Sequence, residues 1–230
     1  NILGKEGIGI NDNFFDLGGH SLKATRLVSQ IHRVFEVKVS LRDLFNHMVL
    51  EDQSRLIVNA VKTAYHTIPE VAASPDYPLS LSQRRLWILS QLSEANVAYN
   101  IPEIYEFRGE LDVALLSSSL SRLISRHEVL RTVFKENGSG DVRQYILSPE
   151  ELGFRIEELD LRGDEDGEDN LKGQVREFVN ESFDLAEGPL LRALLCRLSE
   201  DRWVFAYVMH HIISDGWSME VLIGEVLGYY

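Results

Sequence analysis

Apolar residues recur at helical spacing in three segments of the first 66 residues. The segment that begins at residue 21 predicts an amphipathic helix, whose apolar face is formed by Leu27, Val28, Ile31 and Phe35. Residues 40–45 predict a short capped helix, and residues 50–65 predict another helix with one apolar side. The pattern therefore predicts a small all-helical unit at the start of the chain.

Beyond residue 78 the pattern changes between helical and strand periods. Helical spacing is present in four segments, which are residues 79–89, 113–127, 171–183 and 221–226. Apolar runs typical of strands cover residues 101–107, 129–135, 142–147, 154–159, 190–198 and 202–210. A chain that mixes helices with neighbouring antiparallel strand pairs predicts an α+β fold for this region.

Residues 67–78 separate the two patterns. They hold half of the six prolines of the chain and show neither helical nor strand periodicity, so they predict an extended linker. We therefore divide the chain into a helical domain at residues 1–66, a linker at 67–78 and an α+β domain at 79–230.

Charge and composition exclude several classes of protein. The net charge is −13, and residues 67–230 carry 29 acidic against 15 basic residues. Nucleic-acid binding requires a basic surface, so no nucleic-acid partner is expected. No apolar run approaches the roughly 20 residues that span a bilayer, so no membrane association is expected. The acidic residues 164–169 lack the ligand spacing of a calcium loop and predict a solvated loop, and no metal site is expected.

The single cysteine, Cys196, lies in an apolar run and predicts a buried thiol. One cysteine cannot form an internal disulfide, and the N-terminus lacks a signal-peptide pattern. Both observations favour a reducing environment, so we expect the protein to be cytoplasmic.

The first candidate site is Ser21. Gly18 and Gly19 predict a tight turn before it, and Ser21 opens the first predicted helix. A serine at a helix start is most often only an N-cap. The free N–H groups and the dipole of a helix N-terminus also favour an anion, so a phosphodiester on Ser21 would suit this position.

The sequence around Ser21, DLGGHSL at residues 16–22, resembles the attachment motif of the peptidyl carrier proteins of non-ribosomal peptide synthetases. The preceding NFF at residues 13–15 and the helix that follows match as well. The resemblance implies a four-helix bundle with 4′-phosphopantetheine bound covalently to Ser21. It also implies that most of the first helix is missing from this chain.

The second candidate site is His210 and His211, at the end of the last predicted strand. Adjacent side chains on a strand face opposite ways, so at most one of the two enters any given cleft. Taken alone, such a pair is more often hydrogen-bonded within the fold than catalytic. A zinc site lacks a third ligand at a recognisable spacing. A serine hydrolase lacks the nucleophile-elbow context around Ser214 or Ser218.

Three motifs extend the resemblance beyond residue 78. HHIISDG at residues 210–216 resembles the HHxxxDG motif of non-ribosomal peptide condensation domains, which are relatives of chloramphenicol acetyltransferase. SLSQRRLWIL at residues 80–89 resembles the first core motif of that family, with Ser82 where alanine is usual. RHEVLRTVF at residues 126–134 resembles the second motif without departure.

The resemblance implies an acyltransferase that forms an amide bond between two thioesters. His211 is expected beside the reacting amine, as a general base or as a group that positions the amine. The Gly216 N–H is expected to stabilise the oxyanion. His210 is expected to be structural. Asp215 is expected to hold the loop through a salt bridge to Arg126 or Arg131.

The resemblance also implies the wider context. The fold is expected to be a helical carrier linked to an incomplete chloramphenicol acetyltransferase-like α/β-sandwich lobe. Expected partners are a phosphopantetheinyl transferase, an upstream adenylation domain, a downstream carrier and the aminoacyl or peptidyl thioesters. Family condensation domains have two lobes, so residues 1–230 alone are not expected to catalyse condensation. An epimerisation domain with the same motif, or a non-catalytic carrier and docking fragment, remain alternatives.

Overall fold

The computed structural model describes residues 2–67, 69–92, 97–164 and 166–230. The chain forms two compact units, Asn1–Ala72 and Ala73–Tyr230. Residue 68 of the expected linker lies outside the described residues. The last two linker residues form a short strand, β1 (Tyr77–Pro78), which pairs with β4 of the second unit. The end of the linker is therefore part of the second unit rather than free chain.

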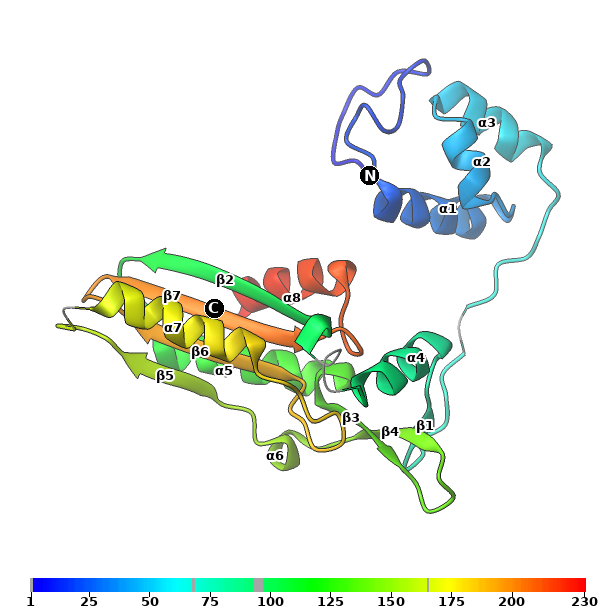
Figure 1. Cartoon of the computed structure of the whole chain (residues 1–230). Helices are drawn as coiled ribbons and strands as arrows, with labels where there is room; N and C mark the ends of the chain where they lie inside the picture. The colour runs from blue at the N-terminus through cyan, green and yellow to red at the C-terminus, as the bar shows by residue number, and fades with distance from the viewer. Residues whose placement is uncertain (1, 68, 93–96, 165) are drawn as a thin grey trace. The chain divides into compact units, whose positions relative to one another are not determined.

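The first unit is helical in its described residues, as predicted. Its helices are α1 (Ser21–Phe35), α2 (Leu41–Asn46) and α3 (Leu50–Asn59) (Figure 1). Ser40 caps α2 through a reciprocal pair of hydrogen bonds with Asp43. Phe14, Ala24 and Leu44 are buried together in its core.

The prediction that α3 continues to residue 65 is wrong. The helix ends at Asn59, and Val61 is 83% exposed. Backbone groups after the helix bond elsewhere: the Thr63 N–H donates to Glu36 O over 2.6 Å. The Lys62 ammonium also donates to Phe35 O. These long-range bonds compete with helix continuation, and the apolar pattern alone does not reveal them.

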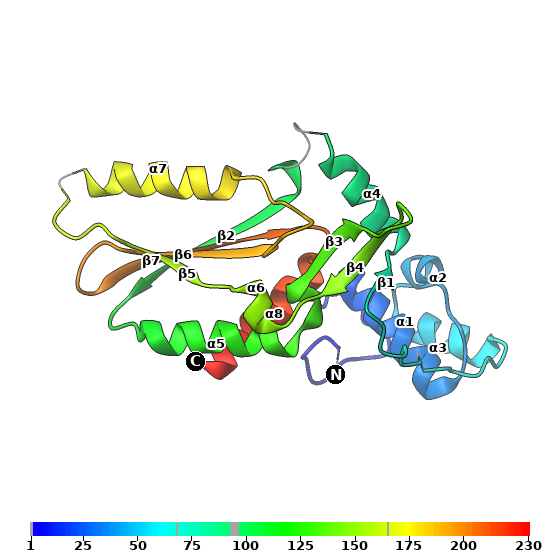
Figure 2. The same cartoon turned by 90° about the horizontal axis from the view of Figure 1, so that it is seen from below.

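The second unit is built on a four-stranded sheet of order β2-β7-β6-β5. The strands β2, β7 and β6 are antiparallel, and β5 is parallel to β6. Helix α7 covers one face, and α5 and α8 cover the other (Figure 2). The bounds are β2 (Asn100–Arg108), β5 (Ile156–Asp160), β6 (Leu191–Arg197), β7 (Arg202–His210), α5 (Val113–Arg126), α7 (Gly167–Asn180) and α8 (Gly216–Tyr229).

Strand β7 lies inside this sheet, with helices on both faces. Its residues from Trp203 to His210 are all buried, including those on either side of the pleat. This double burial explains why the strand is a continuous apolar run rather than an alternating one. Cys196 on the neighbouring strand is fully buried, as predicted, and burial raises the pKa of its thiol to about 11.

A second, three-stranded sheet has the order β1-β4-β3. The remaining elements are α4 (Leu81–Ser90), β3 (Thr132–Glu136), β4 (Val142–Ile146), a short α6 (Pro149–Leu152) and the 3₁₀ turns Val97–Tyr99 and Glu128–Arg131. The strand predicted from residue 129 therefore begins only at Thr132. The Leu130 N–H donates to His127 O, so the intervening residues continue from α5 as a tight turn. The mixed α+β fold is as predicted.

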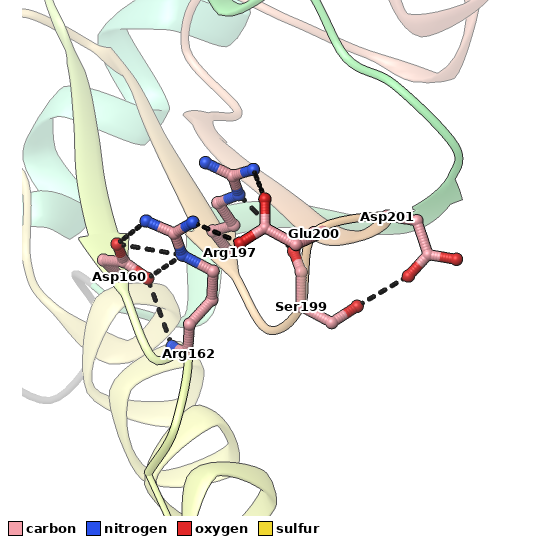
Figure 3. Close-up of polar contacts among 6 residues, drawn as sticks. All are labelled: Asp160, Arg162, Arg197, Ser199, Glu200 and Asp201. Atoms are coloured by element: carbon pink, nitrogen blue, oxygen red, sulfur yellow. Dashed lines mark hydrogen bonds and ion pairs between the residues drawn. The ribbon is translucent and has the colours of Figure 1, made fainter.

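The edge of the main sheet carries a charged network on the exposed surface (Figure 3). Arg162 pairs with Asp160 at the end of β5 and with Glu200 in the turn between β6 and β7, both at 2.6 Å. Glu200 also pairs with Arg197 at 2.7 Å. Hydrogen bonds from Arg162 lower the pKa of Asp160 to about 2. This network ties the parallel strand to the neighbouring hairpin.

Two expectations from the sequence concern the acidic run at residues 164–169 and membrane-spanning helices. In the acidic run 164–169, residue 165 lies outside the described residues. The run does not stay a loop, because Glu168 and Asp169 form the first turn of α7, where negative charge suits the helix dipole. None of the helices in the described residues is long and apolar enough to cross a bilayer.

Candidate functional site

Two glycines shape the turn that leads to Ser21. Gly18 has a φ of 93°, which favours glycine. Gly19 has no room for a side chain, because a Cβ there would lie 2.4 Å from the Phe14 ring. Its N–H donates to Phe14 O over 2.9 Å. The turn therefore requires both glycines, for different reasons.

Ser21 is exposed and is the first residue of α1. The N-cap is His20, whose side chain makes no capping hydrogen bond, so the N-cap interpretation of Ser21 is wrong. A capping hydroxyl would be tied to the helix, whereas the Ser21 side chain stands on the open surface at the positive end of the dipole. These features fit the attachment of a phosphodiester to Ser21.

His210 is the last residue of β7, and its side chain is fully buried. The Ile212 N–H donates to its Nδ1 over 3.1 Å, which leaves the proton on Nε2. That buried Nε2 has no hydrogen-bond partner among the described residues. Burial, with a smaller contribution from the charge of His211, lowers the pKa of His210 to about 4. His210 is therefore a neutral core residue at neutral pH.

His211 begins the turn after β7 and is exposed. Its backbone N–H donates to Tyr99 O over 2.9 Å, and its Nδ1 lies 2.7 Å from Ser214 O. A carbonyl oxygen only accepts, so Nδ1 carries the proton of the neutral ring and Nε2 keeps its lone pair. The Nδ1 side of the His211 ring is thus held by the Ser214 carbonyl. Its Nε2 has no backbone partner among the described residues.

Asp215 does not form the expected salt bridge. It is the N-cap of α8: its carboxylate accepts from the Ser218 N–H over 2.9 Å and from the Ser218 hydroxyl over 2.8 Å. The bond from the Ser218 N–H is the largest of several interactions that lower the pKa of Asp215. Asp215 therefore fixes the start of α8. The sequence alone does not distinguish an aspartate that caps a helix from one that forms a salt bridge.

The two arginines have other partners. Arg126 pairs with Glu225 of α8 at 3.4 Å. Arg131 donates to Leu147 O over 2.6 Å and pairs with Glu128 at 3.4 Å. Arg126 joins α5 to α8, and Arg131 joins the turn after α5 to the end of β4, so the expected salt bridge of either arginine to Asp215 is wrong.

Gly216 is exposed and is the first residue of α8. The first N–H groups of a helix have no partner within the helix, so the Gly216 N–H is of the kind that can stabilise a developing negative charge. His211 and Gly216 lie at the two ends of one short loop between β7 and α8. The loop therefore carries a basic nitrogen at one end and a helix-terminal donor at the other.

Sequence reasoning missed two backbone carbonyls that orient His211, those of Tyr99 and Ser214. Neither has a signal in the sequence, because every residue carries a carbonyl group. It also missed His127 and Glu225, whose side chains form a 2.7 Å contact across 98 positions of sequence. In the sequence, the position of His127 inside the motif at residues 126–134 is the one indication of a role for this residue.

Comparison with known proteins assigns both units. The family described as "Condensation domain" matches residues 73–230, and the family described as "Phosphopantetheine attachment site" matches residues 1–57. Tyrocidine synthase 3 of Brevibacillus parabrevis is 39% identical over all of this chain, which spans 3% of that protein. Gramicidin S synthase 2 of Aneurinibacillus migulanus is 37% identical over all of this chain, which spans 5% of that protein.

Solved structures agree with this assignment. The starter condensation domain of rhizomide synthetase RzmA aligns with a TM-score of 0.62 and 25% identity, covering 68% of this chain and 38% of that chain. The first condensation domain of the calcium-dependent antibiotic synthetase aligns in fold with a TM-score of 0.59 and 24% identity, covering 66% of this chain and 36% of that chain. The chain therefore belongs to the condensation domain family of non-ribosomal peptide synthetases, and a phosphopantetheine attachment site precedes its condensation domain.

Proposed function

We propose that the first unit is a carrier and that Ser21 is its attachment residue. Support comes from the exposed position of Ser21 at the start of α1 and from the two-glycine turn that presents it. When bound, 4′-phosphopantetheine supplies a terminal thiol that holds an acyl group as a thioester. The chain itself presents the serine hydroxyl and places a helix N-terminus beside the phosphodiester.

Phosphopantetheine transfer tests this role. A phosphopantetheinyl transferase with coenzyme A is expected to raise the intact mass of the 230-residue chain by one phosphopantetheine. The Ser21→Ala variant is expected to show no increase, because the acceptor hydroxyl is gone. Ser29→Ala, on the same helix, is the matched control and is expected to load fully. Loading of Ser21→Ala would contradict the assignment.

We propose that the second unit contributes His211 to amide formation. The α-amine of an acceptor aminoacyl thioester attacks the carbonyl carbon of a donor thioester. A C–N bond forms, the C–S bond breaks, and the donor sulfur leaves as a thiolate. The nitrogen must lose a proton, and His211 Nε2 carries the lone pair that accepts it. The observation that carries this proposal is the Nδ1 contact to Ser214 O, which favours that tautomer.

The Gly216 N–H is proposed to stabilise the oxyanion that forms on the attacked carbonyl. Support comes from its place at the first residue of α8, where N–H groups lack helical partners and the dipole is positive. Asp215 keeps this donor in place by capping the helix. His210, Arg126 and Arg131 are proposed to support the loop and its neighbouring elements without contacting the substrate.

We propose that the two units act within a longer synthetase. Their expected partners are an upstream adenylation domain, a downstream carrier and the aminoacyl or peptidyl thioesters, in the cytoplasm. The chain spans only 38% of a solved condensation domain, and α8 exposes Trp217, Val221 and Leu227 on its surface. The 230-residue chain alone is therefore expected to be loaded on Ser21 but not to form an amide.

A further inference from the structure

Apolar residues lie on several sides of helix α8, so their pattern does little to fix the rotation of the helix about its own axis. Leu222 and Val226 are buried, yet Trp217, Val221 and Leu227 lie exposed on other sides. The hydrophobic effect is non-directional, so a helix that is apolar on nearly all sides gains similar burial in several rotations. Directional contacts are needed to choose one of them.

Glu225 supplies such contacts from the third turn of α8. One carboxylate oxygen lies 2.7 Å from His127 Nε2, and the other lies 3.4 Å from Arg126 Nε. A carboxylate only accepts, so His127 donates from Nε2. The Glu225 side chain is 23% exposed and that of His127 is 31% exposed, so water competes only in part for this pair. Both oxygens are therefore directed at the end of α5.

The partners of Glu225 are the last residue of α5 and its C-cap. A cationic group is favoured there by the negative end of the helix dipole. Arg126 also donates to the Tyr229 hydroxyl over 3.4 Å, and the Arg122 guanidinium lies 4.5 Å from the centre of the Tyr229 ring. One side of α8 is thus bound to α5 by a row of polar and cation–π contacts.

The same helix begins at the proposed oxyanion donor. Rotation of α8 by one residue is about 100°, with a rise of about 1.5 Å, and would change the direction of the Gly216 N–H by about the same angle. Strand β7 ends at His210, directly before His211, and it is hydrogen-bonded to β2 on one side and to β6 on the other. Of the two elements that the loop connects, β7 is fixed by the sheet, whereas the position of α8 depends on side-chain contacts.

We propose that Glu225 is a positioning residue of the condensation site. Through His127 and Arg126 it fixes the rotation of α8, and thereby aims the Gly216 N–H at the substrate carbonyl beside His211. The inference rests on the proposed amide-forming function. It adds a residue outside the HHIISDG motif, in a later turn of the same helix, to the group that determines the rate.

A spectroscopic test uses the 230-residue chain and needs no activity. Trp217 lies at the start of α8, about 12 Å along the helix from Glu225, so its indole N–H signal reports rotation of the far end. Glu225→Ala is expected to shift the Trp217 signal while the Trp87 and Trp203 signals stay in place. Glu225→Gln retains an accepting oxygen and is expected to restore the wild-type signal. Glu220→Ala, an exposed glutamate on the same helix, is the matched control for helix composition.

A kinetic test uses the synthetase polypeptide that contains this chain. Glu225→Ala is expected to lower kcat for amide formation by about tenfold or more, a loss of roughly 1.4 kcal/mol of transition-state stabilisation, with KM for the acceptor thioester unchanged. Glu225→Gln is expected to have a kcat close to that of the wild type. His127→Ala, made from the other side of the contact, is expected to match Glu225→Ala, and the double variant is expected to be no slower.

The outcomes separate the two proposals. An unchanged Trp217 signal in Glu225→Ala, or an unchanged kcat in both single variants, would overturn the positioning role and leave amide formation by the wild type intact. A wild type without amide formation would overturn the proposed function, and the Trp217 comparison would still decide whether Glu225 anchors α8. If Glu225→Ala does not fold, His127→Ala and Glu225→Gln carry the same comparison.

Discussion

At the scale of single residues, His210 and His211 are held as opposite tautomers through the same ring nitrogen, Nδ1. The Ile212 N–H donates to Nδ1 of His210, whereas Nδ1 of His211 donates to the Ser214 carbonyl. The sequence could predict that the two side chains separate, because adjacent positions of a strand face opposite ways. It could not predict the tautomers, since these depend on backbone groups that come near only in the folded chain.

The buried His210 makes stability depend on pH. Its pKa is about 4 in the folded chain and near 6.5 when unfolded. Below pH 6.5 the unfolded chain binds a proton that the folded chain does not, so the free energy of unfolding falls with pH until about 4. Between about pH 7 and 4.5 the loss from this residue is expected to be about 2 kcal/mol.

Urea unfolding followed by tryptophan fluorescence measures this effect, because Trp87, Trp203 and Trp217 all belong to the second unit. The His210→Gln variant has a side chain that does not titrate, and its stability is expected to fall less steeply over the same pH range. Carboxylates that titrate at lower pH affect both proteins alike. Equal slopes for the two proteins would contradict a neutral, buried His210.

At the scale of elements, the sequence predicted the strands and long helices of the second unit well. Their apolar periods are long and clear, as in α5 and β7. The errors fall where backbone groups have tertiary partners, as after Asn59, or where a side chain has a nearby alternative partner, as at Asp215. Capping by Asp215 is a local contact with Ser218, three residues away, whereas the expected salt bridge was to a distant arginine.

The first residue of α8 offers a direct test of the oxyanion donor. Proline is tolerated at the first position of a helix, and Asp215 has the extended backbone that proline requires before it. A Cβ at Gly216 meets no atom within 4 Å. Gly216→Pro therefore removes the N–H while the helix start is kept.

Gly216→Ala keeps the N–H and is the matched control. In the synthetase polypeptide, Gly216→Pro is expected to lower kcat for amide formation by about 10²- to 10³-fold, the usual effect of losing one oxyanion donor. Gly216→Ala is expected to stay close to the wild-type rate. Equal rates for the two variants would remove the Gly216 N–H from the mechanism.

At the scale of the whole chain, the two units have separate cores. Phe14, Ala24 and Leu44 form one cluster in the first unit, and the sheet of the second unit is packed against its own helices. From the sequence, the proline-rich segment and the change of period predict two domains with a linker at residues 67–78. The pairing of Tyr77–Pro78 with β4 was not predicted, because a two-residue strand has no period.

Separate cores predict separate effects of mutation. Gly19→Ala would place a Cβ 2.4 Å from the Phe14 ring, and is expected to destabilise the first unit by about 1–3 kcal/mol through overpacking. Thermal unfolding followed by far-ultraviolet circular dichroism reports both units, whereas tryptophan fluorescence reports only the second. The fluorescence transition is expected to stay unchanged.

Gly9→Ala is the control in the same unit, because a Cβ there makes only ordinary contact with Asp12 at 3.5 Å or more. It is expected to have little effect on either transition. A shift of the fluorescence transition in Gly19→Ala would show that the two units unfold together and would contradict this division.

The most direct measurement of the central claim is amide formation by the synthetase polypeptide with His211→Ala, at equal loading of both carriers. Thioester loading is measured by intact mass in the same samples, so that a defect in supply is separated from a defect in condensation. His211→Ala is expected to lower the rate of product formation by about 10²- to 10⁴-fold, the range for a lost general base, with loading unchanged. Product formation at the wild-type rate would contradict the role of His211.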